Sequence, residues 1–161
     1  MIFLTVGTEL PFDRLVRALD DWSSRNPSVE VMGQIGRGAY HPRFIEAFSF
    51  LPSDQYAAAI DRCELIVAHA GMGTILSALR ARKPVIVLPR RAKLGEHRND
   101  HQIATAKAFA KQGLVATAFE RASLWRQLDR RSQLTAPEPL GTEADPTLLE
   151  AIRAFVHDAI T

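Results

Sequence analysis

Two glycines follow a short apolar run near the middle of the chain, in the stretch His-Ala-Gly-Met-Gly-Thr at residues 69–74. The run at residues 65–68 is typical of a buried strand, and the residues after the glycines have the apolar spacing of a helix. A strand, a glycine turn and a helix start place unpaired backbone N–H groups side by side, and glycine lets another group approach them closely. Because the helix dipole favours negative charge at this end, the stretch predicts a phosphate-binding turn.

The densest polar segment is the loop at residues 90–102, which has four fixed positive charges, two histidines and two acidic residues. Two interpretations stay open. In the first, the loop is a solvated segment before a helix that Asn99 or Asp100 caps. In the second, its cations attract an anionic ligand, while Asp100 and Gln102 bind hydroxyl groups. The two histidines have helical spacing, but the sequence offers them no third ligand, so we expect no metal.

His69 is the candidate for a catalytic group, because it stands at the strand end beside the glycine turn. It is either a structural histidine or a hydrogen-bond donor to phosphate or to an attacking group. Thr8 and Thr74 have hydroxyls for a phosphate, although both positions also suit helix caps. The chain lacks the P-loop motif, the three-glycine dinucleotide fingerprint and the G-x-S-x-G elbow, which argues against P-loop kinases, nicotinamide enzymes and α/β hydrolases.

Strand and helix patterns alternate along the chain. Strands are predicted at residues 2–6, 29–35, 45–51, 65–68, 85–88 and 114–119. Helices are predicted after Pro11, from a cap at Ser53, after the glycine turn, at about residues 99–112 and around residues 124–128. A connection at residues 135–146 leads to a C-terminal helix at residues 147–160 with one apolar side. No repeat or composition shift divides the chain, so residues 1–161 are predicted to form one domain.

This alternation predicts a mainly parallel, Rossmann-like sheet with helices on both faces. In such sheets ligands bind beyond the carboxyl ends of the strands. Three loops, at residues 7–11, 69–73 and 89–98, are expected at this edge, and they are rich in glycine, histidine and arginine. Their shared position is a second reason to predict a binding site there.

The composition argues against several classes of protein. The chain has 161 residues, 47% of them apolar and 24% charged, and its net charge of +2 does not argue for a nucleic-acid partner. The single Cys63 offers neither a disulfide framework nor a zinc cluster. No apolar span reaches the length of a transmembrane helix, and no signal peptide is visible, so we expect a cytoplasmic protein.

Several motifs resemble the C-terminal, donor-binding half of family 28 glycosyltransferases. They are the glycine stretch at residues 69–74, Ala78-Leu79, Lys-Pro-Val-Ile-Val-Leu-Pro at residues 83–89, and His101-Gln102. Thr-Val-Gly-Thr at residues 5–8 with Phe-Asp-Arg-Leu at 12–15 resembles the small subunit of the two-part transferase that makes dolichol-linked chitobiose. The loop at 89–102 resembles bacterial split β-1,4-glucuronosyltransferases of exopolysaccharide assembly. The resemblance reaches about residue 119 and implies the fold of the C-terminal half of a GT-B enzyme.

The resemblance implies a set of donor-binding residues around a UDP-sugar. They are Gly7, Thr8, Leu51, His69, Gly71, Met72, Gly73, Thr74, Ser77, Arg90, Arg91, Glu96, His97, Arg98, Asp100, His101 and Gln102. Phe50 and Leu51 lie where the family places uracil. Many relatives carry Glu where Ser77 stands, and that carboxylate binds the ribose hydroxyls. Here the ribose must be held by Ser77 or from elsewhere.

The resemblance also implies the reaction. The chain would be the donor-binding subunit of an inverting, two-component transferase, with no metal or other cofactor. A membrane-anchored partner would hold a lipid-linked saccharide acceptor, so the chain would work at the inner face of the membrane. The catalytic base is expected to come from this partner, and without the partner the exposed surface could form a homodimer.

The basic loop favours glucuronic acid from UDP-glucuronate as the transferred sugar, with Arg90, Arg91 or Arg98 binding its carboxylate. Two alternatives stay open. One is a UDP-GlcNAc transferase subunit of lipid-linked oligosaccharide synthesis. The other is a non-catalytic nucleotide-binding scaffold.

Overall fold

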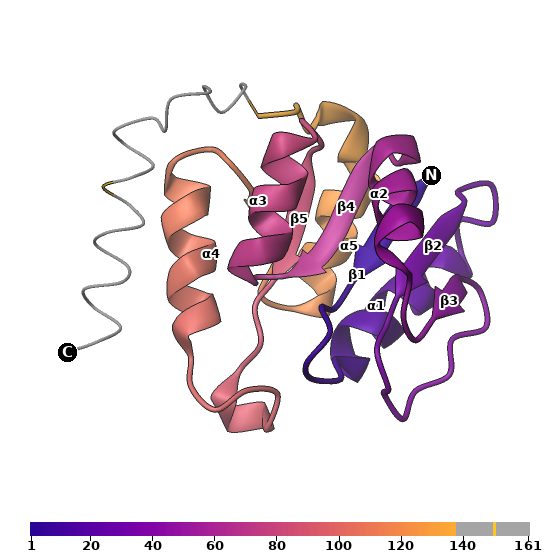
Figure 1. Cartoon of the computed structure of the whole chain (residues 1–161), viewed down its shortest axis with the longest axis horizontal. Coiled ribbons are helices and arrows are strands. Elements are labelled where there is room, and N and C mark those ends of the chain that lie inside the picture. The colour runs from indigo at the N-terminus through magenta and orange to yellow at the C-terminus, as the bar shows by residue number, and fades with distance from the viewer. Residues whose placement is uncertain (138–149, 151–161) are drawn as a thin grey trace.

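A computed structural model describes residues 1–137 and residue 150 of the chain (Figure 1). The described part has a six-stranded parallel sheet in the order β3-β2-β1-β4-β5-β6. Its strands are β1 (Ile2–Thr5), β2 (Val31–Gln34), β3 (Glu46–Phe48), β4 (Leu65–His69), β5 (Val85–Leu88) and β6 (Ala116–Thr117). The α-helices are α1 (Asp13–Ser23), α2 (Ser53–Arg62), α3 (Met72–Arg80), α4 (His101–Lys111) and α5 (Arg121–Asp129). Short 3-10 helices occur at η1 (Ala92–Leu94) and η2 (Arg131–Gln133).

Two apolar layers cover the two faces of the sheet. Alternate side chains of β1 show why: Ile2 and Leu4 pack with the apolar stripes of α1 and α5, whereas Phe3 packs with α2, α3 and α4. In Figure 1, α3 and α4 lie in front of the sheet and α5 lies behind it. The predicted doubly covered parallel sheet is therefore confirmed.

Several predicted boundaries are wrong in detail. The last strand is predicted at residues 114–119 but has only Ala116 and Thr117, while the flanking Val115 and Ala118 are buried in the core. Ser53 is not the cap of its helix: Pro52 is the residue before the first turn, and no side chain caps it. The predicted C-terminal helix at 147–160 and most of the connection at 135–146 lie outside the described residues.

The loops that the sequence places at the carboxyl edge of the sheet lie at this edge in the structure. The chain leaves β1, β4 and β5 at their carboxyl ends, and the loops after β1 and β5 both lie at the lower edge of Figure 1. Within the described part of the chain, no helix has the length and apolarity needed to span a membrane.

Candidate functional site

A cleft of ≈ 360 Å³ opens at the carboxyl edge of the sheet, where the loops after β1, β4 and β5 meet. Its lining comes from all three loops and from the first turns of α3 and α4: Val6, Gly7, Thr8, Glu9, Leu10, His69, Gly71, Gly73, Thr74, Arg90, His97, His101 and Gln102. A larger hollow of ≈ 610 Å³ lies at the opposite end, next to Met1 and Glu64. That hollow has no glycine turn, so the phosphate prediction applies to the smaller cleft.

The cleft continues into an adjoining hollow of ≈ 400 Å³ that shares Gly7, Thr8, Gly73 and Thr74 with it. Aromatic and aliphatic side chains line this second part, among them Phe50 and Tyr56, whereas the first part is lined mainly by polar groups and backbone. The pair of hollows therefore has a polar end and an apolar end, the arrangement that a nucleoside diphosphate requires.

The start of α3 has no side-chain cap. Gly71 is the residue before its first turn, and no side chain accepts a hydrogen bond from the N–H groups of that turn. Uncapped N–H groups at a helix start carry partial positive charge and bind anions. Because Gly71 and Gly73 line the cleft, these donors are available to a ligand there.

The loop after β1 supplies a second set of donors. Gly7 turns the chain with a φ of 78°, in the left-handed region that glycine adopts freely. Among residues 1–137, no group accepts a hydrogen bond from the backbone N–H of Thr8, Glu9 or Leu10. Both predicted phosphate turns thus line one cleft and have backbone N–H groups without a partner in the described part of the chain.

The imidazole of His69 lies between these two turns. A Cβ at Gly7 would come 2.9 Å from His69 Cε1, and a Cβ at Gly71 would overlap His69 Nε2. Gly7 and Gly71 are therefore required for two reasons. A Cβ at either position would clash with this ring, and the absence of a side chain lets a ligand approach the backbone N–H groups. Burial, with the cation of Arg90 as a second cause, lowers the pKa of His69 to about 4, so the ring is neutral at physiological pH.

We expect the lowered pKa of His69 to make the folding stability of the protein depend on pH. Below its ordinary pKa of 6.5, His69 takes up a proton in the unfolded chain but not in the folded one, so stability falls as the pH drops toward 4. His69 should account for roughly 2 kcal/mol of the stability lost between about pH 7.5 and pH 5. Urea unfolding at both pH values should show a smaller loss for His69→Gln than for the wild type. An equal loss would contradict the assignment.

Gly73 has a different environment from Gly71, because a Cβ at Gly73 meets no protein atom within 4 Å. Alanine is the better helix former by roughly 0.5–1 kcal/mol, so Gly73→Ala should raise the thermal midpoint. Its methyl group would project into the cleft, and we expect UDP affinity to fall by about tenfold. Calorimetric titration with UDP measures this, with the exposed helical change Ala108→Gly as the control that lowers stability alone. Unchanged affinity in Gly73→Ala would exclude the start of α3 as the diphosphate site.

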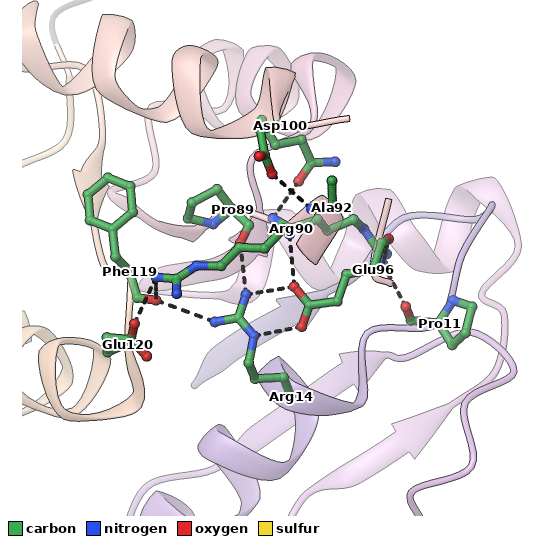
Figure 2. A network of polar contacts seen from close by, with 11 residues as sticks. Pro11, Arg14, Pro89, Arg90, Ala92, Glu96, Asp100, Phe119 and Glu120 are labelled. Carbon is green, nitrogen blue, oxygen red and sulfur yellow. Dashed lines mark hydrogen bonds and ion pairs between the residues drawn. The ribbon is translucent and has the colours of Figure 1, made fainter. Parts of the chain in front are cut away.

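The loop after β5 is held by a network of ion pairs and backbone contacts (Figure 2). Arg14 of α1 forms two hydrogen bonds with the carboxylate of Glu96, at 2.6 and 2.8 Å, and also donates to the carbonyl of Pro89. The same carboxylate accepts the N–H of Arg91 at 2.9 Å. The Glu96 carboxylate is thus bonded to Arg14 and Arg91, and Glu96 does not line the cleft.

The two arginines after β5 donate to the protein itself. The guanidinium of Arg90 donates to the carbonyls of three residues in the loop after β1, and the residue is only 2% exposed. Arg91 donates to the carbonyl of Phe119 and pairs with Glu120 at 2.9 Å. The expectation that either one binds a sugar carboxylate conflicts with this arrangement, because the terminal donors of Arg90 are bonded to backbone carbonyls, whereas Arg91 pairs with Glu120 and does not line the cleft.

The remaining loop residues divide into two groups. His97, His101 and Gln102 line the cleft, and the two histidine rings meet edge to face with centroids 4.4 Å apart. Gln102 Oε1 accepts the N–H of Arg90, which leaves its NH₂ group for a ligand. Arg98 and Asp100 are exposed and do not line the cleft.

Asp100 accepts the N–H of Ala92 at 2.8 Å, so its carboxylate neither caps α4 nor faces the cleft. Asn99 is the residue that bonds near the helix start, through the N–H and the ring of His101. Asp100 is therefore the residue before the first turn of α4, but neither its side chain nor that of Asn99 forms a capping hydrogen bond with the helix. The hydroxyl-binding prediction for Asp100 has no support in this arrangement.

At the apolar end, Leu51 is buried, and its N–H donates to the side chain of Gln34 at 2.9 Å. The Ser77 hydroxyl donates to the carbonyl of Gly73, and its oxygen still has lone pairs facing the second hollow. Met72 packs against the core beneath α3. The structure brings Leu51 and Ser77 together around the second hollow, and their predicted contacts with a nucleoside stay predictions.

Sequence reasoning missed Arg14, Gln34 and Tyr56. Arg14 looks like a solvent-facing residue of a helix, and its partner Glu96 lies 82 residues away. Gln34 had one available signal, a polar residue at the end of a predicted buried strand, a position where buried polar groups need partners. Tyr56 packs against the core and also lines the second hollow.

Several solved glycosyltransferase structures share this fold. The NMR solution structure of ALG13 matches with a TM-score of 0.64 at 21% identity, covering 99% of this chain and 96% of that one. The crystal structure of the glycotransferase of kitacinnamycin matches with a TM-score of 0.61 at 18% identity, covering 98% of this chain and 38% of that one. The fold is the Rossmann-like C-terminal half of a GT-B glycosyltransferase.

The model of the glycosyltransferase family 28 C-terminal domain matches residues 1–141, so this chain belongs to that family. Human UDP-N-acetylglucosamine transferase subunit ALG13 is 31% identical over 123 residues, which are 70% of this chain and 10% of that protein. The Candida glabrata protein of the same name is 25% identical over 138 residues, 83% of this chain and 63% of that protein. The chain therefore spans less than two thirds of these relatives.

Proposed function

We propose that this chain is the donor-binding subunit of a two-component inverting glycosyltransferase and that its donor is UDP-N-acetylglucosamine. One observation carries the proposal: two sets of backbone N–H groups without a partner among residues 1–137, at the start of α3 and at residues 8–10, belong to segments that line one cleft. The names of its relatives, which are subunits of a UDP-N-acetylglucosamine transferase, support the donor and the two-component organisation.

The chemistry follows from this arrangement of donors. Breaking the bond between the sugar and UDP develops negative charge on the diphosphate, which fixed N–H groups and a helix N-terminus stabilise without rearranging. The charge of Arg90 lies at the same cleft, so the chain supplies positive potential from its own residues and needs no metal in this proposal. The base for the acceptor hydroxyl comes from a membrane-anchored partner that holds a lipid-linked saccharide, which places the chain at the inner face of the membrane.

The choice of the donor sugar rests on the contacts of the loop after β5 and of the first residues of α4. UDP-glucuronate was expected because the loop is basic, but Arg90 and Arg91 donate to carbonyls and to Glu120, and Arg98 does not line the cleft. The cleft instead offers His101 and the NH₂ group of Gln102, which suit the hydroxyl and acetamido groups of a neutral sugar.

Two measurements test the proposal. Calorimetric titration of the full chain with UDP should show binding, and no uptake would overturn the proposal. A membrane fraction that contains the partner, supplemented with the chain, should transfer sugar from UDP-N-acetylglucosamine in preference to UDP-glucuronate and UDP-glucose. A preference for UDP-glucuronate would reject the donor but leave the two-component assignment in place.

A further inference from the structure

The buried side chain of Arg90 makes more hydrogen bonds within the protein than a residue that only binds a ligand would need. Nη1 donates to the carbonyl oxygens of Pro11 at 2.6 Å and Glu96 at 3.4 Å. Nη2 donates to those of Val6 at 2.8 Å and Leu10 at 2.6 Å. The guanidinium carbon also lies 4.5 Å from the centre of the Phe12 ring. All four terminal N–H donors of this buried cation are therefore used within the chain.

The carbonyls that Arg90 binds belong to the loop whose N–H groups are free. Carbonyl oxygens carry partial negative charge, and they would repel a diphosphate bound next to Gly7 and Thr8. Arg90 neutralises three of them and fixes the direction in which they point. The N–H groups of residues 8–10, next to the same cleft, have no partner among residues 1–137.

The backbone of Arg90 makes a second connection. Its N–H donates to Oε1 of Gln102 at 3.1 Å, and Gln102 is 4% exposed at the start of α4. One residue thus links the loop after β1, at one side of the cleft, with the Gln102 side chain at the other.

We propose that Arg90 is a positioning residue: it holds the carbonyls of residues 6–11 so that the N–H groups of residues 8–10 bind the diphosphate, and it sets the distance between this loop and Gln102. This rests on the proposed function, because the ligand is the UDP part of the donor. The planar fork of arginine is required, since an ammonium group is a single point that cannot reach the carbonyls of Val6, Leu10 and Pro11 together.

The test compares Arg90→Lys with Arg14→Lys. Arg14 is also bonded to backbone carbonyls, those of Pro89 and Phe119, but within the described residues its side chain donates to no carbonyl of residues 6–11. Both variants should lose thermal stability. In a ¹⁵N NMR titration with UDP, wild type and Arg14→Lys should show shifts of the Thr8, Glu9 and Gly73 amides.

In Arg90→Lys, the shifts at Thr8 and Glu9 should disappear while Gly73 still responds, and UDP should bind about tenfold more weakly. If Arg90→Lys does not fold, Arg90→Gln, whose amide keeps two donors, is titrated in its place. Wild-type shifts and affinity in the folded Arg90 variant would overturn this inference and leave the proposed function intact. Absence of UDP binding by the wild type would overturn the proposed function itself.

Discussion

Replacing Gly71 with alanine should weaken UDP binding by roughly 100-fold. The new methyl group would overlap His69 Nε2, and the same ring also lies close to Gly7, where a Cβ would come 2.9 Å from His69 Cε1. Either the ring or the start of α3 must move, at a cost of about 1–3 kcal/mol in folding stability. Calorimetric titration with UDP and urea unfolding measure the two effects separately.

A double variant shows whether this overlap is the cause. His69→Ala removes the ring, so Gly71→Ala should cost much less stability in that background than in the wild type. We expect a coupling energy above about 1 kcal/mol between the two changes. Simple additivity would mean that Gly71→Ala acts through the helix start alone, and that the close approach of His69 has no energetic consequence.

Replacing Gln102 with glutamate should reduce sugar transfer by about 100-fold or more without unfolding the chain. The carboxylate keeps an acceptor for the N–H of Arg90, so the loop retains its connection to α4. The NH₂ donors are lost, and a negative charge is placed at the end of the cleft in which we propose that the diphosphate binds. Transfer from the labelled UDP-sugar, assayed with the partner-containing membrane fraction, measures the effect.

The control for Gln102→Glu is Thr105→Val, a substitution on the same helix. The Thr105 hydroxyl donates to the carbonyl of His101 and does not line the cleft, so this variant should transfer sugar at close to the wild-type rate. If Gln102→Glu binds UDP and transfers sugar normally, the chain is better described as a nucleotide-binding scaffold, and catalysis belongs to the partner.

The position of the site follows from the sequence because the signals for it are local. A buried strand followed by glycines is visible at residues 65–73, and strand alternation alone places the loops after β1, β4 and β5 at one edge. Gly7, His69 and Gly71 could thus be assigned to one cleft without coordinates. The short β6 was overestimated because Leu114 and Val115 are apolar for packing rather than for strand pairing.

The roles within the basic loop did not follow from the sequence. Arginine donates equally well to a phosphate, a carboxylate or a carbonyl, and carbonyls occur at every residue and leave no pattern. Arg90 and Arg91 were therefore assigned to a ligand when their partners are residues 6–11, Phe119 and Glu120. Contacts such as Arg14 with Glu96 join segments far apart in the chain and need the folded structure to be recognised.

The two walls of the cleft belong to the two apolar layers, which lie on opposite faces of the sheet. The loop after β1 leads into α1 on one face of the sheet, whereas Gly73 and Gln102 belong to α3 and α4 on the other. A nucleotide that contacts both walls is in effect a removable cross-link between the layers. Its binding should slow amide hydrogen exchange in α1 as well as in α3 and α4, so that the empty and loaded chains differ in cooperativity across the whole sheet.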